Sequence, residues 1–181
     1  MKVVGVFGIS GVGKTTLVER VVAGRVGWAR VSAGSFVQDI RPGLTRDALR
    51  ASAGEEFHEN QMAIVEGLHR LRAGLNVEVL LFDGHLVIDN GWDLVEVPLD
   101  VVRRLELSAV VFIEDVPETI VERRAADGGR ERAERSEEHI ANEQSTSRRV
   151  ASSYAYALAV PFASFMPTEH LEVVAFVKGL W

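Results

Sequence analysis

Nine residues near the N-terminus constrain the fold of this 181-residue chain more than any other feature. Residues 8–16 read GISGVGKTT and match the pattern G-x-x-x-x-G-K-[ST] without a gap. The β-branched run over residues 2–7 predicts a strand before them, and residues 13–22 predict a helix with one apolar face. A glycine-rich turn between a strand and a helix presents backbone N–H groups and a helix N-terminus to anions. The sequence therefore predicts a phosphate-binding loop (P-loop) in an α/β domain.

The residue types within the P-loop predict how it holds a nucleotide. Its glycines allow the backbone conformations that turn successive N–H groups inward. Lys14 is expected to reach the β- and γ-phosphates of ATP, and Thr15 offers a hydroxyl to Mg²⁺. The residues expected to bind the nucleotide here are Gly8, Ser10, Gly11, Val12, Gly13, Lys14, Thr15 and Thr16.

Strand and helix patterns alternate along the rest of the chain. Further strands are expected over residues 28–32, 76–82, 109–114 and 160–165. Helices are expected over residues 45–50, 55–72, 98–105, 117–126, 136–159 and 169–180, with Ser136 as an N-terminal cap. Regular alternation indicates a parallel sheet covered by helices on both faces. We predict a three-layer αβα sandwich with a five-stranded parallel sheet, in a single domain.

A carboxylate that could complete a magnesium site follows one of these strands. Asp83 comes directly after the buried run over residues 77–82, at the edge of the sheet where ligands bind in open α/β folds. Thr15 and Asp83 are therefore the predicted metal ligands. The alternative is that Asp83 and Gly84 only terminate the strand. His85 lies two residues further on and is expected to face the same cleft or to be structural.

Arginine is unusually frequent: 17 of the 20 basic residues are arginines. Codon bias explains such a ratio, but some arginines are also placed for phosphate recognition. Arg46 and Arg50 are four residues apart, so on a helix they share a face and form a clamp for a phosphate. Gln61, on the following helix, is placed to read the edge of a base.

A second group of seven arginines lies within residues 123–149, on both sides of a glycine-containing loop. Arginines of this kind could close over a transferring phosphoryl group and neutralise its charge. The alternative is an ordinary solvated surface, because glutamates interleave with the arginines and could pair with them.

Composition excludes several classes of function. The net charge of −6 disfavours a nucleic-acid partner. The absence of cysteine excludes a disulfide scaffold, a thiolate zinc site and a cysteine nucleophile. The apolar runs are too short to cross a membrane, so we expect no membrane association and a cytoplasmic location. The sequence leaves the oligomeric state open, and a homo-oligomer is compatible with it.

Taken in order, the motifs resemble those of nucleoside monophosphate kinases, most closely the archaeal-type adenylate kinases, over nearly the full length. The resemblance is carried by residues 8–16, Arg46, Arg50 and Gln61, the DGH of residues 83–85, Arg123 and Arg124, the loop over residues 127–132, and the SEE of residues 136–138 followed by Gln144, Arg148 and the YA of residues 154–155. It implies a P-loop kinase core over residues 1–34, 74–126 and 137–181. An acceptor-binding helical flap over about 35–73 and a short lid over about 127–136 would be inserted in this core.

The resemblance also implies roles for individual residues. Arg46 and Arg50 would hold the acceptor phosphate and Gln61 its base, with His85 also on the substrate side. Arg124 would lie near the adenine or the phosphates of the donor. The implied reaction is phosphoryl transfer from MgATP to a nucleoside monophosphate, with AMP as the default acceptor. The residues expected to act in catalysis are Lys14, Asp83, Arg130, Arg132 and Arg148.

Two departures from the family pattern leave alternatives open. Ala126 and Ala133 stand where relatives often carry a basic residue and an aspartate, which predicts a less charged lid. Another small P-loop kinase acting on CMP, a deoxynucleotide or a metabolite is one alternative, and an ATP-dependent binding or assembly factor with weak ATPase activity is another. Residues 86–97 receive no predicted role, and Trp92 is expected to be a partly exposed packing residue.

Overall fold

The computed structural model describes residues 1–40, 54–126 and 135–181. The helix predicted over residues 45–50 lies outside these ranges, as do Arg46, Arg50, Arg130, Arg132 and Ala133. Within the described ranges, no helix is both long enough and apolar enough to span a membrane.

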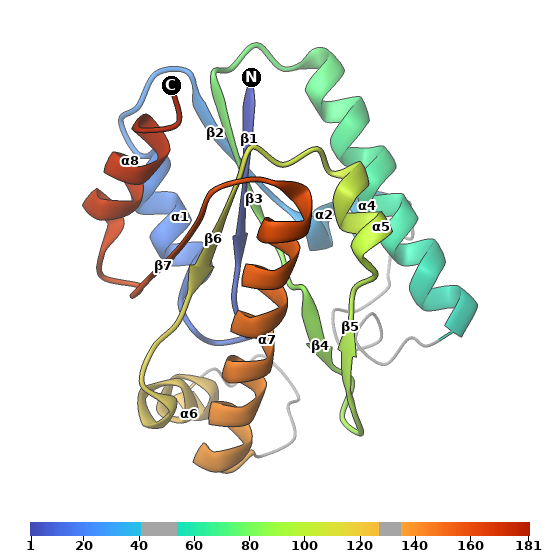
Figure 1. The fold of residues 1–181 in the computed structure, drawn as a ribbon, viewed down its shortest axis with the longest axis vertical. Coiled ribbons are helices and arrows are strands. Elements are labelled where there is room, and N and C mark those ends of the chain that lie inside the picture. Colours follow the sequence, from blue (N-terminus) through green and yellow to red (C-terminus); the bar gives the residue numbers. More distant parts are fainter. Residues whose placement is uncertain (41–53, 127–134) are drawn as a thin grey trace.

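A five-stranded sheet forms the centre of the molecule, and its strands run parallel in the order β2-β3-β1-β6-β7 (Figure 1). The strands are β1 (Lys2–Phe7), β2 (Trp28–Ser32), β3 (Val79–Asp83), β6 (Ala109–Ile113) and β7 (Phe162–Phe165). The three inner strands are buried almost throughout, which explains their near-continuous apolar sequence. The predicted five-stranded parallel sheet is confirmed.

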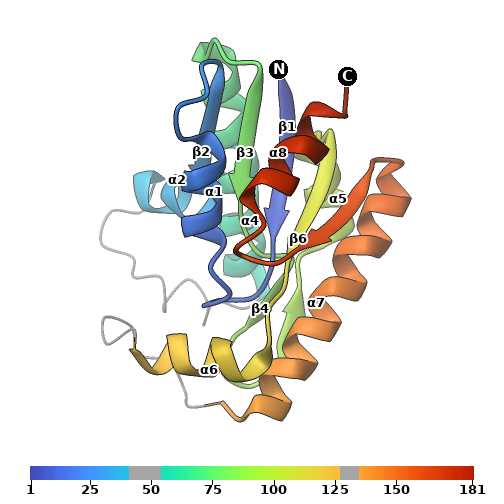
Figure 2. The ribbon, with the colours of Figure 1, turned by 90° about the vertical axis from the view of Figure 1, so that its left-hand side faces the viewer.

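Helices cover both faces of this sheet, as the three-layer prediction requires (Figures 1 and 2). The helices are α1 (Lys14–Val22), α2 (Ala33–Ile40), α4 (Gly54–Gly74), α5 (Leu99–Arg104), α6 (Pro117–Ala126), α7 (Glu137–Leu158) and α8 (His170–Lys178). Helices α1 and α8 pack on one face, whereas α4, α5 and α7 pack on the other. The predicted cap of α7 is also confirmed, because Ser136 Oγ accepts a hydrogen bond from the His139 amide at 3.2 Å.

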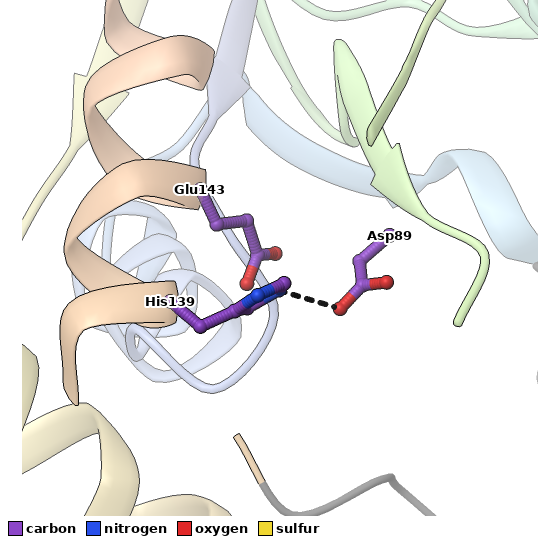
Figure 3. A group of neighbouring side chains, drawn as sticks. All are labelled: Asp89, His139 and Glu143. Atoms are coloured by element: carbon purple, nitrogen blue, oxygen red, sulfur yellow. Dashed lines mark hydrogen bonds and ion pairs between the residues drawn. The ribbon is translucent and has the colours of Figure 1, made fainter. Parts of the chain in front are cut away.

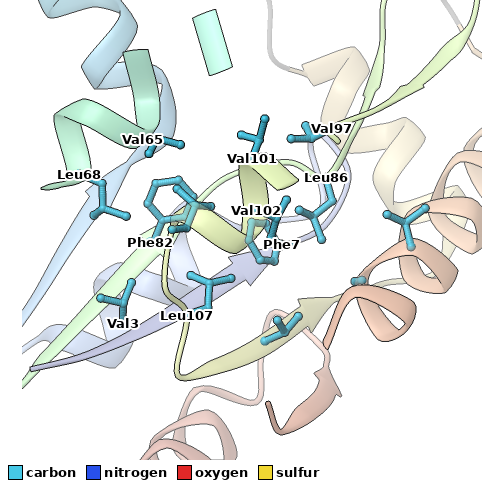
Figure 4. Packing of buried hydrophobic residues seen from close by; sticks show 14 of the residues in the cluster. Val3, Phe7, Val65, Leu68, Phe82, Leu86, Val97, Val101, Val102 and Leu107 are labelled. Carbon is cyan, nitrogen blue, oxygen red and sulfur yellow. The ribbon is translucent and has the colours of Figure 1, made fainter. Parts of the chain in front are cut away.

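The alternation of side chains along β1 divides the core into two clusters. Val3 and Phe7 point to the face covered by α4 and α5, whereas Val4 and Val6 point to the face covered by α1 and α8. In the first cluster Phe7 packs edge-on against Phe82 of β3, with ring centroids 6.3 Å apart (Figure 4). Hydrophobic side chains build both clusters, so they fix the register of the sheet and the positions of its carboxyl ends.

One helix and one two-stranded hairpin were not predicted from the sequence. Helix α2 packs on α4 so closely that a Cβ at Gly67 would lie 2.4 Å from Phe36 Cδ1. Strands β4 (Val87–Asp89) and β5 (Leu94–Glu96) form an antiparallel hairpin with an Asn-Gly pair at its tip. Trp92 at this tip is 92% exposed, so the expectation that it packs against the protein is wrong.

Candidate active site

The P-loop joins the end of β1 to the start of α1, and its glycines are required by the backbone. Gly11 and Gly13 adopt φ angles of 82° and 103°, which residues with a side chain rarely do. At Gly8 the constraint is space, because a Cβ would lie 2.4 Å from the Ile113 carbonyl oxygen of the neighbouring strand. The loop therefore keeps the geometry that turns its N–H groups toward an anion.

The Lys14 side chain lies along this loop. Its Nζ donates hydrogen bonds to the carbonyl oxygens of Gly8 and Ile9, both at 2.9 Å, and the residue is buried. An ammonium group held against the loop in this way is placed for a phosphate that the loop binds.

Thr15 and Asp83, the predicted metal ligands, lie side by side. Strand β3 pairs directly with β1, with Asp83 opposite Val6, so Asp83 reaches the start of α1. Thr15 Oγ1 donates a hydrogen bond to Asp83 Oδ2 at 3.1 Å. A hydroxyl and a carboxylate beside a phosphate loop are the oxygen donors that Mg²⁺ prefers, so these residues fit that ion.

One cleft of about 590 Å³ brings most of the predicted site residues together. Of those residues, the following line it: Ser10, Gly11, Gly13, Lys14, Thr15, Thr16, Gln61, Asp83, His85 and Arg124. The P-loop lines it together with apolar side chains of α2, α4 and α5, among them Val37, Ile64 and Val101, and the buried Gln61 lines it as well.

Arg148 is not among the residues that line the cleft. It lies on α7 with its Nε 3.3 Å from Glu114 Oε2, and its Nη2 donates to Ser164 Oγ at 3.4 Å. Its predicted contact with a phosphate stays a prediction, as do the roles of the four arginines outside the described ranges.

The two arginines at the end of α6 contact the P-loop backbone. Arg124 Nε donates to the Ser10 carbonyl oxygen at 2.8 Å, and Arg123 Nη1 donates to that of Val12 at 3.1 Å. Each is also paired with a carboxylate, Arg124 with Glu143 at 2.9 Å and Arg123 with Asp115 at 2.7 Å. Helix α6 therefore ties the P-loop to α7.

Two further residues of the cleft wall, Asp89 and Glu143, received no role from the sequence, and they lie there beside Arg135, one of the seven arginines predicted to act on a phosphoryl group. Asp89 accepts two hydrogen bonds from Arg135 and lies 3.3 Å from His139 Nε2. Burial alone would raise the pKa of Asp89, but the hydrogen bonds from Arg135 and the Gly91 amide, with the Arg135 charge and His139, lower it below its ordinary value. The Asn-Gly pair of residues 90–91 was the sequence signal for the hairpin that places Asp89.

Comparisons with known proteins show which proteins the chain is similar to. A family model described as an AAA domain matches residues 7–141, a range that contains every predicted site residue except Arg148. The chain is 31% identical over 152 residues to an adenylate kinase of Thermoplasma acidophilum, a match that covers 81% of this chain and 79% of that protein. It is 29% identical over 160 residues to an adenylate kinase of Pyrococcus abyssi, with 84% and 80% covered.

Proposed function

Because the chain belongs to the nucleoside monophosphate kinases of the P-loop superfamily, we propose that it transfers the γ-phosphoryl group of MgATP to AMP, giving two molecules of ADP. One observation carries the proposal. A single cleft is lined by Lys14, Thr15 and Asp83, which fit a phosphate and its metal ion, and also by two buried carboxamides of α4, Asn60 and Gln61, together with apolar side chains. A protein that only hydrolysed ATP would need the first part and not the second.

On the donor side, the P-loop amides and Lys14 would bind the β- and γ-phosphates. Thr15 and Asp83 would hold Mg²⁺, which when bound neutralises negative charge on the phosphate oxygens. Arg124 is held against Ser10 and would lie beside the donor nucleotide. Together these groups orient the γ-phosphoryl group and stabilise the charge that it carries in transfer.

On the acceptor side, the apolar part of the cleft suits a purine or pyrimidine ring. Gln61 can both donate and accept hydrogen bonds, so its carboxamide would select a base by its edge. Arg46 and Arg50 would hold the acceptor phosphate, and His85 would lie near it. This chemistry depends mainly on holding the two nucleotides in line and excluding water, because phosphoryl transfer needs little covalent help from the protein.

An ADP-release assay with MgATP and a panel of monophosphates tests the proposal. We expect AMP to stimulate ADP formation strongly, and Lys14→Ala to abolish the stimulation because it removes the cation of the P-loop. Stimulation by CMP or a deoxynucleotide alone would show a related kinase with another acceptor. If no monophosphate raises ADP formation above slow hydrolysis, the kinase proposal is wrong and a nucleotide-driven binding factor is the better account.

A further inference from the structure

A cluster of charged side chains lies where the β4–β5 hairpin faces the first turns of α7 (Figure 3). Asp89 from the hairpin and His139 and Glu143 from α7 each offer a ligand atom, and these atoms lie within 4.8 Å of one another. Such a group could hold a metal ion. However, Arg135 already pairs with Asp89 and Arg124 already pairs with Glu143. The two negative charges are balanced by two positive ones, so the cluster is complete as an ion-pair network without a metal.

Arg135 is fixed in this network along one edge of its guanidinium group. Its Nε lies 3.0 Å from Asp89 Oδ2, and its Nη2 lies 2.9 Å from Asp89 Oδ1 and 2.8 Å from the Gly91 carbonyl oxygen. This is the bidentate arrangement that orients an arginine most strictly. Nη1 donates to no atom of the described residues, although Arg135 is one of the residues that line the cleft.

Arg124 is held in the same way on the P-loop side of the cleft. Its Nε bonds to Ser10 and its Nη2 to Glu143, and its Nη1 has no acceptor among the described residues. Glu143 lies one helical turn after His139, so the same face of α7 connects the two arginines. Each arginine thus has an edge that the protein holds and an Nη1 group with no acceptor in residues 1–40, 54–126 and 135–181.

We propose that Arg135 is a further ligand-binding arginine of this cleft: its Nη1 group donates hydrogen bonds to a phosphate oxygen of the bound nucleotide, and Asp89 is the positioning residue that orients it. The inference rests on the proposed function only in taking the ligand to be a nucleotide. The phosphate could belong to ATP or to the monophosphate, and separate binding measurements distinguish them. Because Asp89 neutralises the guanidinium, the contribution is that of oriented hydrogen bonds, about tenfold in affinity.

Isothermal titration calorimetry with MgATP and with AMP tests the proposal on the whole protein. We expect Arg135→Ala and Arg135→Lys to raise the Kd of one nucleotide about tenfold, because neither side chain reproduces the fixed fork. Asp89→Asn should raise the same Kd several-fold. The double variant Asp89→Asn/Arg135→Ala should bind no more weakly than Arg135→Ala alone, because Asp89 acts through Arg135.

A matched ion pair outside the cleft provides the control. Arg72 pairs with Glu106 at 2.6 Å, its side chain is 24% exposed against 21% for Arg135, and neither residue lines the cleft. Arg72→Ala and Glu106→Gln should leave both Kd values unchanged. A thermal melt of each variant separates loss of binding from loss of folding, and if Arg135→Ala does not fold, Arg135→Lys and the isosteric Asp89→Asn carry the test.

Two results would overturn the proposal. One is an unchanged Kd for both nucleotides in a folded Arg135→Lys or Arg135→Ala variant. The other is stoichiometric, sub-micromolar binding of ZnCl₂ by the nucleotide-free protein that His139→Ala abolishes, which would identify the cluster as a metal site. These measurements do not depend on phosphoryl transfer. A protein that binds ATP through Arg135 but phosphorylates no monophosphate would refute the proposed function and leave this inference intact.

Discussion

The buried pair between Arg124 and Glu143 allows a quantitative prediction about stability. The two side chains are 11% and 4% exposed, and Arg124 also contacts the P-loop through Ser10. Glu143→Gln keeps the shape of the side chain and one hydrogen-bond acceptor but removes the charge that balances Arg124. Removing one partner of a buried ion pair costs about 3–5 kcal/mol. We expect about 2–3 kcal/mol here, because the glutamine oxygen still accepts a bond and the cleft admits water.

The measurement is urea unfolding followed by circular dichroism at pH 7. For a chain of this size, the expected loss corresponds to a fall in Tm of about 4–12 °C. The urea midpoint should fall while the slope m stays unchanged, because the surface exposed on unfolding is the same. Arg124→Met in the Glu143→Gln background should restore part of the stability, since it removes the unbalanced charge.

Glu96→Gln is the matched control, because Glu96 also pairs with an arginine at 2.9 Å but on the exposed surface. We expect it to cost under about 1 kcal/mol. Equal losses in Glu143→Gln and Glu96→Gln would refute the argument that burial makes the Arg124–Glu143 pair a structural link between α6 and α7.

Three further predictions concern packing, polar burial and pH. Gly67→Ala should lower the free energy of unfolding by about 1–3 kcal/mol in urea, because the new methyl group would meet the buried Phe36. A stability equal to wild type would contradict the close packing of α2 on α4. Ser147→Ala should leave the stability unchanged or raise it by up to about 1 kcal/mol, because the buried Ser147 hydroxyl has no hydrogen-bond partner among the described residues. A clear loss of stability would show that the hydroxyl has a partner. The lowered pKa of Asp89 means that its contribution to stability is present above its ordinary pKa of 3.8 and is lost as the pH falls through the lowered value. Asp89→Asn should therefore flatten the acid limb of a stability-against-pH curve, and an unchanged limb would contradict the shift.

The fold could be predicted largely because its sheet is buried on both sides. The inner strands needed apolar residues at nearly every position, and that pattern is visible without knowing their partners. Helix α2 was missed because Gly34 and Ser35 give its sequence little helical preference. It forms because Phe36 and Val37 pack into the core beside Gly67.

The β4–β5 hairpin was missed for a related reason. Its strands have three residues each, too few for a periodic pattern. Contacts from α7 and from Arg135, which precedes its cap, hold the hairpin in place. Arg135 donates to Asp89, Arg149 of α7 donates to Glu96, and the Tyr154 hydroxyl of α7 donates to the Val97 carbonyl oxygen. These contacts depend on how α7 lies against the hairpin, which residue spacing alone does not give.

The same distinction applies to the site. Lys14, Thr15 and Asp83 could be placed because a contiguous loop and the end of a neighbouring parallel strand must meet at one edge of the sheet. Glu143 and Arg148 lie on one helix, and the sequence did not give the rotation of that helix about its axis. Glu143 faces the cleft, whereas Arg148 contacts Glu114 and Ser164.

The most direct test of the central claim follows the transferred group itself. The protein is incubated with ATP labelled at the γ-phosphate, Mg²⁺ and unlabelled AMP, and the products are separated. Transfer predicts label in the β-phosphate of ADP, formed in proportion to the AMP consumed. Label released only as inorganic phosphate, at a rate that AMP does not change, would contradict the account.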